Sequence, residues 1–277
     1  MCVLLKRAVF LCGLAWLGGC AAKAPPAPLP PKPAPPVAVN YTPDITALRQ
    51  ALAADVPGSE SPQYGDDALW ISRTKAQFAA SPYGITTAQL VVAVDRNPAV
   101  QQMRIIFAAP HSPWQVIGGG KVSTGRAGRR GYFITPTGVF AHTTAILDYR
   151  AEGTYNENHI RGLGIKGRRV WDFGWQPAVE GWRADGAMND IRLLLHATDP
   201  DYLEPRLGRP DSKGCVRISA RMNVFLDQYA VLDADYLHAA PTDRAYAAVL
   251  PANGTPSPLA GSYMVVFDSS EPPPSPR

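Results

Sequence analysis

The sequence predicts a mainly β fold with flanking helices, of the α+β class. Between residues 89 and 122, short runs of apolar and β-branched residues alternate with glycine and proline signals, which is typical of strands joined by turns. Apolar residues at helical spacing occur before this region and again after residue 219. Because 46% of the 277 residues are hydrophobic and 18% are charged, the chain can bury a substantial core.

The N-terminus has the layout of a bacterial export signal. Two cationic residues precede an apolar run over residues 8–19, which is short for a bilayer span of about 20 residues. Residues 17–20, Leu-Gly-Gly-Cys, resemble a lipobox, so we expect a signal peptide over residues 1–19 and a lipid on Cys20. Plain secretion and an uncleaved anchor are the alternatives. In a Gram-negative bacterium, Ala21 resembles the signal for the outer membrane, with the protein facing the periplasm.

Residues 20–40 are expected to form an extended tether. Eight of the twelve residues at 25–36 are proline, and this composition favours polyproline II. At about 3.1 Å per residue, the tether would hold a domain roughly 60 Å from a membrane. Residues 41–88 begin with a helix-start signal, Thr-Pro-Asp at 42–44, followed by apolar residues at helical spacing from Ile45. One or two short helices are predicted there.

The main domain is predicted over residues 89–240. Its first strands are indicated by apolar runs at 90–94 and 103–107, and three glycines at 118–120 predict a turn. Residues 141–190 contain three tryptophans, many glycines and no clear period. They predict a long loop excursion that forms a lid or groove, or else a decorated surface with aromatic anchors packed on the core.

The rest of the chain continues this alternation. A strand over 191–195 is predicted to end at His196, and Ser219 is predicted to cap the helix that follows it. Residues 241–268 are predicted to be a C-terminal extension with a closing strand. Residues 269–277, rich in proline and serine, are predicted to be a disordered tail.

Cys215 is the one cysteine expected to keep a free thiol. Of the four cysteines, two lie within the signal peptide and Cys20 would carry the lipid. In an oxidising compartment an odd cysteine is a candidate reactive thiol, and the alternative is a buried structural cysteine. Because Cys215 lies on a glycine-bearing loop ahead of a helix, we expect the helix start to favour its thiolate.

His196 is the candidate partner of this thiol. A cysteine nucleophile needs a base and a set of donors for the oxyanion that forms when it attacks a carbonyl group. The histidine ends a strand nineteen positions before Cys215, so a loop can return the thiol to that strand end. Gly214 allows close approach of the backbone, so that nearby amides can point at the oxyanion.

At these residues the chain resembles the L,D-transpeptidase catalytic domain, also called the YkuD-type domain. The family signature is a histidine, a gap of some sixteen residues, and then Ser/Thr-His-Gly-Cys-x-Asn/Arg; residues 212–217 read Ser-Lys-Gly-Cys-Val-Arg. Residues 122–126 and 134–140 resemble a second segment of the family. The resemblance covers roughly residues 89–235, and it implies a β-sandwich with the catalytic cysteine on a loop before a helix.

The resemblance implies an enzyme that acts on peptidoglycan stem tetrapeptides. Cys215 would attack the carbonyl group of the diamino acid at position three, expel D-alanine and form a thioester, which an amine then resolves. His196 would be the general base and acid, with its ring oriented by the carbonyl group of Ala197. Support for the oxyanion or substrate is implied for Ser212, Lys213, Gly214 and Arg217, and the loop excursion adds His142, Trp171 and Trp175 as candidate groove residues.

Lys213 departs from the family pattern, which usually has histidine there. Lysine keeps a hydrogen-bond donor and adds a fixed charge, so it can change the acceptor preference or the ionisation of the thiol. The nearest alternative function ends the same thioester with water, as an L,D-carboxypeptidase or amidase. A different class is a non-catalytic wall-binding module in which Cys215 is merely buried.

Charge and motif content argue against other classes. The net charge of +4 comes without a dense block of Lys and Arg, so nucleic acid is not an expected partner. The sequence has no His-x-His, HExxH or CxxC motif, so a zinc hydrolase would lack its ligands, and no metal or cofactor is expected. The expected partners are peptidoglycan stem peptides, a membrane through the lipid on Cys20, and carbapenem-type inhibitors. The sequence does not indicate an oligomeric state.

Overall fold

The computed structural model describes residues 39–60 and 66–277. The signal peptide, Cys20 and nearly all of the proline-rich tether lie outside the described residues. Residues Asn40–Arg277 form one compact unit. Within the part of the chain that the structure describes, no helix has the length and apolar character needed to cross a membrane.

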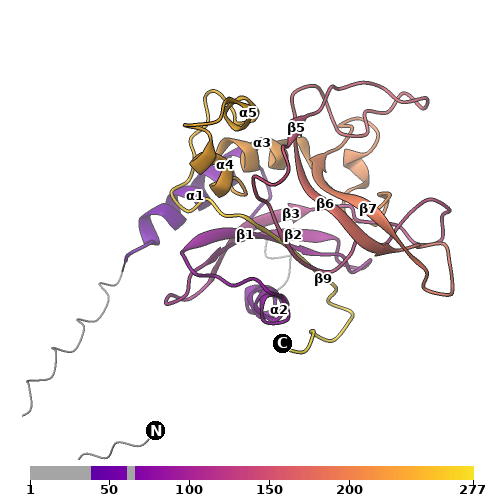
Figure 1. Ribbon diagram of the computed structural model, residues 1–277, viewed down its shortest axis with the longest axis horizontal. Helices are drawn as coiled ribbons and strands as arrows, with labels where there is room; N and C mark the ends of the chain where they lie inside the picture. Colours follow the sequence, from indigo (N-terminus) through magenta and orange to yellow (C-terminus); the bar gives the residue numbers. More distant parts are fainter. Residues whose placement is uncertain (1–38, 61–65) are drawn as a thin grey trace, which may run out of the picture. The chain divides into compact units, whose positions relative to one another are not determined.

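Five strands form sheet A, in the order β3-β2-β1-β9-β4 (Figure 1). β1 (Gln89–Asp95), β2 (Gln102–Ala108) and β3 (Gln115–Lys121) form an antiparallel meander. β9 (Tyr263–Phe267) runs parallel to β1 and antiparallel to β4 (Gly138–Ala141). The strand made last therefore fills the interior of the sheet. The strands predicted at 90–94 and 103–107, and the closing strand predicted within the extension at 241–268, are confirmed.

Four strands form sheet B, in the order β5-β6-β7-β8. β6 (Arg169–Val179) and β7 (Met188–Ala197) form a long antiparallel hairpin, flanked by β5 (Tyr149–Arg150) and β8 (Val216–Ile218). The prediction of a loop excursion over 141–190 is therefore wrong for its second half. The first six residues of β6 are all buried, yet they include Arg169, Asp172 and Gly174, so they show neither the alternation of a half-exposed strand nor a continuous apolar run.

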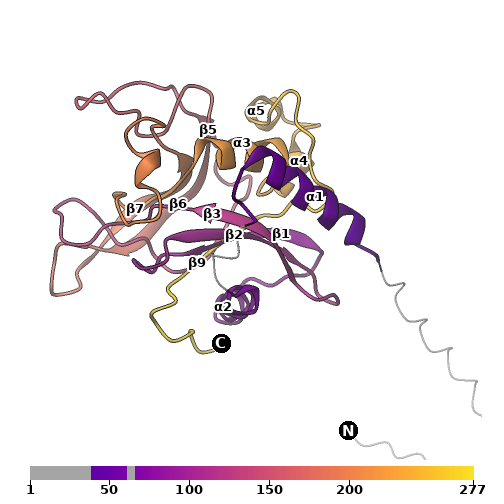
Figure 2. The same ribbon diagram turned by 180° about the vertical axis from the view of Figure 1, so that it is seen from behind.

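The helices lie on different sides of the two sheets. α2 covers one face of sheet A, whereas α1 and α3 lie on the opposite face (Figure 2). Ser219 accepts a hydrogen bond from the amide of Met222 at the start of α3, so the predicted helix cap is confirmed. The helices are α1 (Thr42–Asp55), α2 (Asp67–Ala79), α3 (Ala220–Gln228), α4 (Ala234–Ala239) and α5 (Arg244–Val249), with a 3₁₀ turn at Glu204–Arg206.

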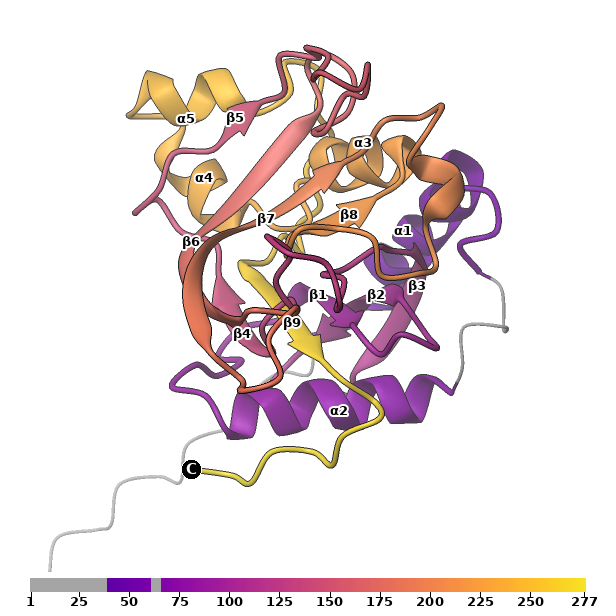
Figure 3. The same cartoon turned by 90° about the vertical axis from the view of Figure 1, so that its right-hand side faces the viewer.

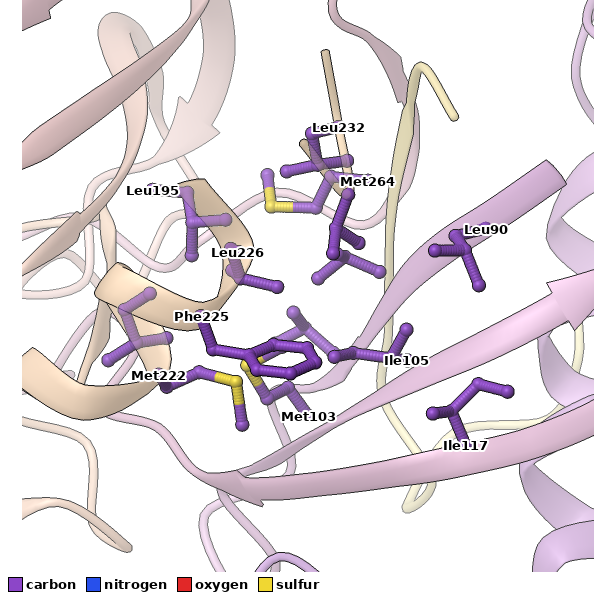
Figure 4. Close-up of a cluster of buried hydrophobic side chains, with 14 of the residues drawn as sticks. Leu90, Met103, Ile105, Ile117, Leu195, Met222, Phe225, Leu226, Leu232 and Met264 are labelled. Atoms are coloured by element: carbon purple, nitrogen blue, oxygen red, sulfur yellow. The ribbon is translucent and has the colours of Figure 1, made fainter. Parts of the chain in front are cut away.

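One hydrophobic core joins the two sheets to α1 and α3. Strands of both sheets and α3 send apolar side chains into it, and the cluster is drawn in Figure 4. Burial of these side chains is the main stabilising term, at about 25 cal/mol per Å² of apolar surface. The predicted mainly β architecture with flanking helices, a β-sandwich of the α+β class, is confirmed. Labelled core residues include Leu90, Met103, Ile105, Leu195, Met222, Phe225, Leu226 and Met264.

The three glycines at 118–120 continue β3 and do not form the predicted turn. A Cβ atom on Gly119 would lie 2.0 Å from the carbonyl oxygen of Met103 on β2. One on Gly118 would lie 2.6 Å from a methyl carbon of Leu52 on α1. β3 therefore approaches its neighbours so closely that only glycine fits, which explains glycines inside a strand.

The tail at 269–277 packs along α2, so the prediction of a disordered tail is wrong (Figure 3). Arg73 of α2 donates a hydrogen bond of 2.6 Å to the carbonyl oxygen of Glu271. The amide of Arg277 donates one of 3.0 Å to the carbonyl oxygen of Ala79. The tail has few apolar side chains, and it is held instead by hydrogen bonds between its backbone and α2. The amino-acid composition of the tail does not reveal these hydrogen-bond partners.

Candidate active site

Cys215 lies at a bend directly before β8, next to the middle strand β7. The register pairs Leu195 of β7 with Val216 of β8, which places Cys215 beside Leu194. Side chains alternate between the two faces of a sheet, and Leu195 and Val216 point into the core. Cys215 and His196 therefore share the other face of sheet B, at diagonal positions on neighbouring strands. We call this the site face.

The thiol of Cys215 is partly buried and protonated at neutral pH. Its Sγ donates a weak hydrogen bond of 3.5 Å to the carbonyl oxygen of Arg192. Burial raises the pKa of the thiol, while the amide of Leu194 and the charge of Arg217 act in the lowering direction. The expectation of a thiolate favoured by a helix start is wrong for the resting protein, because β8 separates Cys215 from α3.

His196 is 4% exposed and is held by its own neighbour in the chain. Its Nδ1 lies 2.5 Å from the carbonyl oxygen of Ala197, which can only accept, so Nδ1 carries the proton and Nε2 is free of one. Burial lowers the pKa of His196 to about 4, and the nearby charge of Arg217 acts in the same direction. The imidazole is therefore neutral at pH 7 and able to accept a proton at Nε2.

The loop that carries Cys215 is fixed by hydrogen bonds at consecutive positions. Ser212 Oγ donates to the carbonyl oxygen of Cys215 at 2.6 Å and accepts from the amide of Gly214 at 3.1 Å. Thr135 Oγ1 donates to the carbonyl oxygen of Gly214 at 2.7 Å. Gly214 has φ +134°, and a Cβ there would lie 2.7 Å from Ile191 Cδ1. Ser212 and Gly214 therefore shape the loop, and the Gly214 amide is already engaged.

The two sequence motifs meet at this loop. Ser123 exchanges two main-chain hydrogen bonds of 3.0 Å with Arg217. The amide of Ser212 donates to the carbonyl oxygen of Thr124 at 2.9 Å, and buried Gln101 holds the Thr124 hydroxyl at 2.8 Å. The segment at 122–126 thus acts as a support for the cysteine loop, which explains why both motifs occur in one domain.

The remaining loop residues differ in exposure. The Arg217 guanidinium donates to the carbonyl oxygen of Asp211 at 2.9 Å, and burial lowers its pKa. It lies close enough to influence both the thiol and the imidazole. The Lys213 side chain is exposed, while its carbonyl oxygen accepts from the amide of Phe133 at 3.2 Å. Arg217 is thus a cation close to both Cys215 and His196, whereas the side chain of Lys213 is exposed to solvent.

Sequence reasoning missed three polar residues on the site face. Asp172 of β6 pairs with Leu194 of β7, so it lies in the same row as Cys215. Arg192 binds the Asp172 carboxylate, and Tyr149 of β5 lies near enough for the charges of Asp172 and Cys215 to act with burial in raising the pKa of its hydroxyl. Alternation from His196 back to Arg192 is the signal that could have identified the arginine.

Of the three groove candidates, only Trp175 lies on the site face, where it pairs with Arg192 and is 65% exposed. Trp171 is fully buried, and its Nε1 donates to Asp233 at 3.2 Å. His142 is also fully buried. The prediction that Trp171 and His142 line a groove is therefore wrong, because both belong to a buried polar network behind the sheet.

That network is a cluster of charges around Arg169. The Arg169 guanidinium lies 2.8 Å from Asp148 and 2.9 Å from Asp233, and His142 Nε2 lies 2.9 Å from Asp148. Burial by itself lowers the pKa of His142, but the two carboxylates outweigh it and the pKa is raised. The ligand atoms of His142, Asp148 and Asp233 lie within 4.8 Å of one another. Arg169 binds one oxygen of each carboxylate, so these groups form a buried ion network, in which Asp233 Oδ2 has no hydrogen-bond partner among the described residues.

A thiol and a neutral imidazole on one face of a mixed sheet are the groups that an enzyme with a cysteine nucleophile needs. Residues 89–235, more than half of the chain, match the family model described as the YkuD L,D-transpeptidase catalytic domain. The chain therefore belongs to the L,D-transpeptidase catalytic domain family. Membership implies activity of the L,D-transpeptidase type and binding of peptidoglycan. No curated protein sequence matches the chain.

Proposed function

We propose that this protein is a peptidoglycan L,D-transpeptidase in which Cys215 is the nucleophile and His196 the general base. The observation that supports the proposal is that a thiol and an imidazole with an unprotonated Nε2 share the site face, at diagonal positions on neighbouring strands. The lowered pKa of His196, about 4, keeps the base neutral at the pH of most envelopes.

The first step moves the acyl group to sulfur. The Cys215 thiol passes its proton to His196 Nε2 as Sγ bonds to the carbonyl carbon of the diamino acid at position three. The C–N bond to the terminal D-alanine then breaks, and His196 returns the proton to the leaving amine. The products are a thioester on Cys215 and free D-alanine, so atoms and protons balance.

The second step releases the enzyme. The amine of an acceptor stem attacks the thioester, His196 takes one of its protons, and the new amide forms as the C–S bond breaks. The same proton returns to Sγ and restores the thiol. Water in place of the amine would give a shortened stem, so hydrolysis differs from transfer only in the acceptor. Arg217, which lies near the thiol, supports the oxyanion formed in both steps.

Incubation of the purified protein with tetrapeptide muropeptides tests this proposal. The expected products, identified by mass spectrometry, are dimers linked between two diamino acids together with free D-alanine. Shortened stems alone would establish the carboxypeptidase alternative. The control is Cys215→Ala, which should form neither product. A wild-type protein that leaves the peptides intact and takes up neither iodoacetamide nor a carbapenem at Cys215 would overturn the proposal and favour a wall-binding module.

We also propose that the mature protein is a lipoprotein of the cell envelope, anchored through Cys20 in the outer membrane and facing the periplasm. The lipobox-like residues 17–20 and the proline-rich segment after them support this. Growth with labelled palmitate should label the wild type and leave Cys20→Ala unlabelled, with both proteins matched for expression. An unlabelled wild type, or equal label in both, contradicts lipidation at Cys20.

A further inference from the structure

Within the part of the chain that the structure describes, Arg192 projects on the site face with only the Nε–H of its guanidinium engaged in a hydrogen bond. Its Nε lies 2.8 and 2.9 Å from the two carboxylate oxygens of Asp172. Among residues 39–60 and 66–277, no acceptor lies within hydrogen-bonding distance of Nη1 or Nη2, and the side chain is 41% exposed. The two terminal nitrogens therefore offer a planar pair of donors to solvent on the site face.

Two neighbours, Asp172 and the ring of Trp175, hold the Arg192 guanidinium in place. Asp172 is only 5% exposed, and its Oδ1 also accepts a hydrogen bond of 2.8 Å from the amide of Gly174. The Arg192 Cζ lies 5.8 Å from the centroid of the Trp175 ring. An arginine held in this way loses little side-chain entropy when it binds an anion, and its fork matches a carboxylate with two parallel hydrogen bonds.

The position of Arg192 relative to Cys215 selects which anion it can reach. Cys215 Sγ lies 3.5 Å from the carbonyl oxygen of Arg192. Asp172, which binds the Arg192 Nε, lies in the row of Cys215, so the guanidinium is held on the site face near the row of the thiol. In a peptide whose scissile carbonyl sits at Sγ, the terminal carboxylate lies about 4 Å beyond that carbonyl. The Arg192 side chain begins at the strand position that the thiol contacts, so its terminal nitrogens can reach a carboxylate placed in this way with hydrogen bonds of about 3 Å.

We propose that Arg192 binds the terminal carboxylate of the leaving D-alanine, with Asp172 as its positioning residue, and so selects donors that end one residue after the scissile bond. This inference rests on the proposed function, because it names the group of the donor that the site face recognises. A pentapeptide would carry its carboxylate one residue further out, where the fixed guanidinium does not meet it.

The test compares three synthetic donors: a tetrapeptide with a free terminal carboxylate, the same peptide as a terminal amide, and one amidated instead at the carboxylate of the diamino acid. For the wild type, kcat/KM should fall about 10²-fold with the terminal amide and change little with the other amide. Arg192→Gln should use the free acid roughly 10- to 100-fold less well and the terminal amide equally well.

The matched control is Arg183→Gln, which removes an exposed arginine paired with Asp185 at the turn between β6 and β7. It should behave as the wild type does. The proposal is overturned if the wild type uses the acid and the terminal amide equally, if Arg192→Gln slows both to the same extent, or if the preference follows the carboxylate of the diamino acid.

Binding separates this inference from the proposed function. In a Cys215→Ala background, calorimetry with the same peptides measures recognition without turnover. If the wild type turns over none of them, transfer and hydrolysis both fail as functions, yet a preference for the free acid that Arg192→Gln abolishes would still support the inference. Equal binding of acid and amide in this background overturns it. Asp172→Asn should weaken the preference only partly, since the guanidinium remains.

Discussion

His142 and His196 are both buried, and they resemble each other in the contact of Nδ1 but differ in the charges around the ring. In both, Nδ1 lies against a main-chain carbonyl oxygen, that of Ala197 for His196 and that of Leu232 for His142. Nε2 of His142 lies 2.9 Å from the carboxylate of Asp148, whereas the charge that acts on the pKa of His196 is that of a cation, Arg217. Burial acts to lower both pKa values, yet that of His142 ends raised and that of His196 ends at about 4.

The difference shows how one fold gives two histidines opposite electrostatic surroundings. Where carboxylates converge behind sheet B, they favour the protonated form of the histidine. Where they are absent, burial leaves a neutral ring with an open nitrogen, which suits a catalytic base. The neighbouring charges, and not the degree of burial, separate the two roles.

The largest expected effect comes from exchanging the two histidines in turn for asparagine. His196→Asn should lower kcat by roughly 10⁴-fold or more with little change in the midpoint of unfolding. His142→Asn should leave kcat within about threefold at low temperature and lower the midpoint, because it removes a buried partner of Asp148. Equal losses of activity in the two variants would contradict the division of roles.

The next largest effect should be the loss of stability when Arg169, the cation of the buried network, is replaced. Arg169→Met leaves the carboxylates of Asp148 and Asp233 buried without their partner, which should lower the free energy of unfolding by about 3–5 kcal/mol. Urea denaturation followed by circular dichroism measures it. Arg183→Met, at an exposed pair, should change stability by less than about 0.5 kcal/mol. A similar small change for Arg169→Met would show that the network does not support the fold.

Stability should depend on pH in opposite senses at the two histidines. The raised pKa of His142 contributes stability that is complete below about pH 6.5 and is lost as pH rises through its folded pKa. The lowered pKa of His196 acts the other way: between pH 6.5 and about 4 the unfolded chain takes up a proton that the folded chain refuses. This should remove up to about 3 kcal/mol as the pH falls.

Denaturation midpoints measured from pH 4 to 9 check these two slopes. His196→Asn should flatten the acidic slope and leave the alkaline one, and His142→Asn should do the reverse. In the wild type, the acid limb of kcat/KM should fall near pH 4, as expected for a base of that pKa. An acid limb near 6.5 would mean that His196 is not held neutral by burial.

The smallest effect is a change in the ionisation of the thiol. The carboxylate of Asp172 acts to raise the pKa of Cys215, so Asp172→Asn should lower it. The rate of alkylation by iodoacetamide as a function of pH reports this directly. Arg192→Gln is the control for loss of the ion pair. If Asp172→Asn raises the thiol pKa, the carboxylate does not act on the thiol through its charge.

Much of the fold could be predicted from local patterns. The half-exposed helices α1 and α2 show apolar spacing, and β1, β2 and β9 are β-rich runs between turn signals. β6 could not be predicted, because Arg169, Asp172 and Gly174 interrupt its buried run, which is therefore neither alternating nor continuously apolar. Gly118 and Gly119 were predicted to form a turn, but they lie in a strand. Glycine is needed there because α1 and β2 pack too closely for a Cβ atom, and the local sequence does not reveal those neighbours.

The residues of the site also fall into those that the sequence predicts and those that it does not. Cys215 and His196 could be proposed from sequence because a family motif and a strand end mark them. Asp172 and Arg192 could not, because they meet only through the register of β6 with β7, twenty residues apart along the chain. The sequence also holds no sign that the carboxylates surround His142 and not His196. Charge placement across strands is a tertiary property, and local spacing does not encode it.

The interior position of β9 has a consequence for how this protein reaches its native state. The family match ends at residue 235, yet β9, at Tyr263–Phe267, lies between β1 and β4. Until a growing chain has passed this segment, β1 has one open edge and β4 has no partner in sheet A. Such contacts between distant segments slow folding, and open edges invite pairing with other chains. Sheet A can therefore be completed only after residues 263–267 have been synthesised.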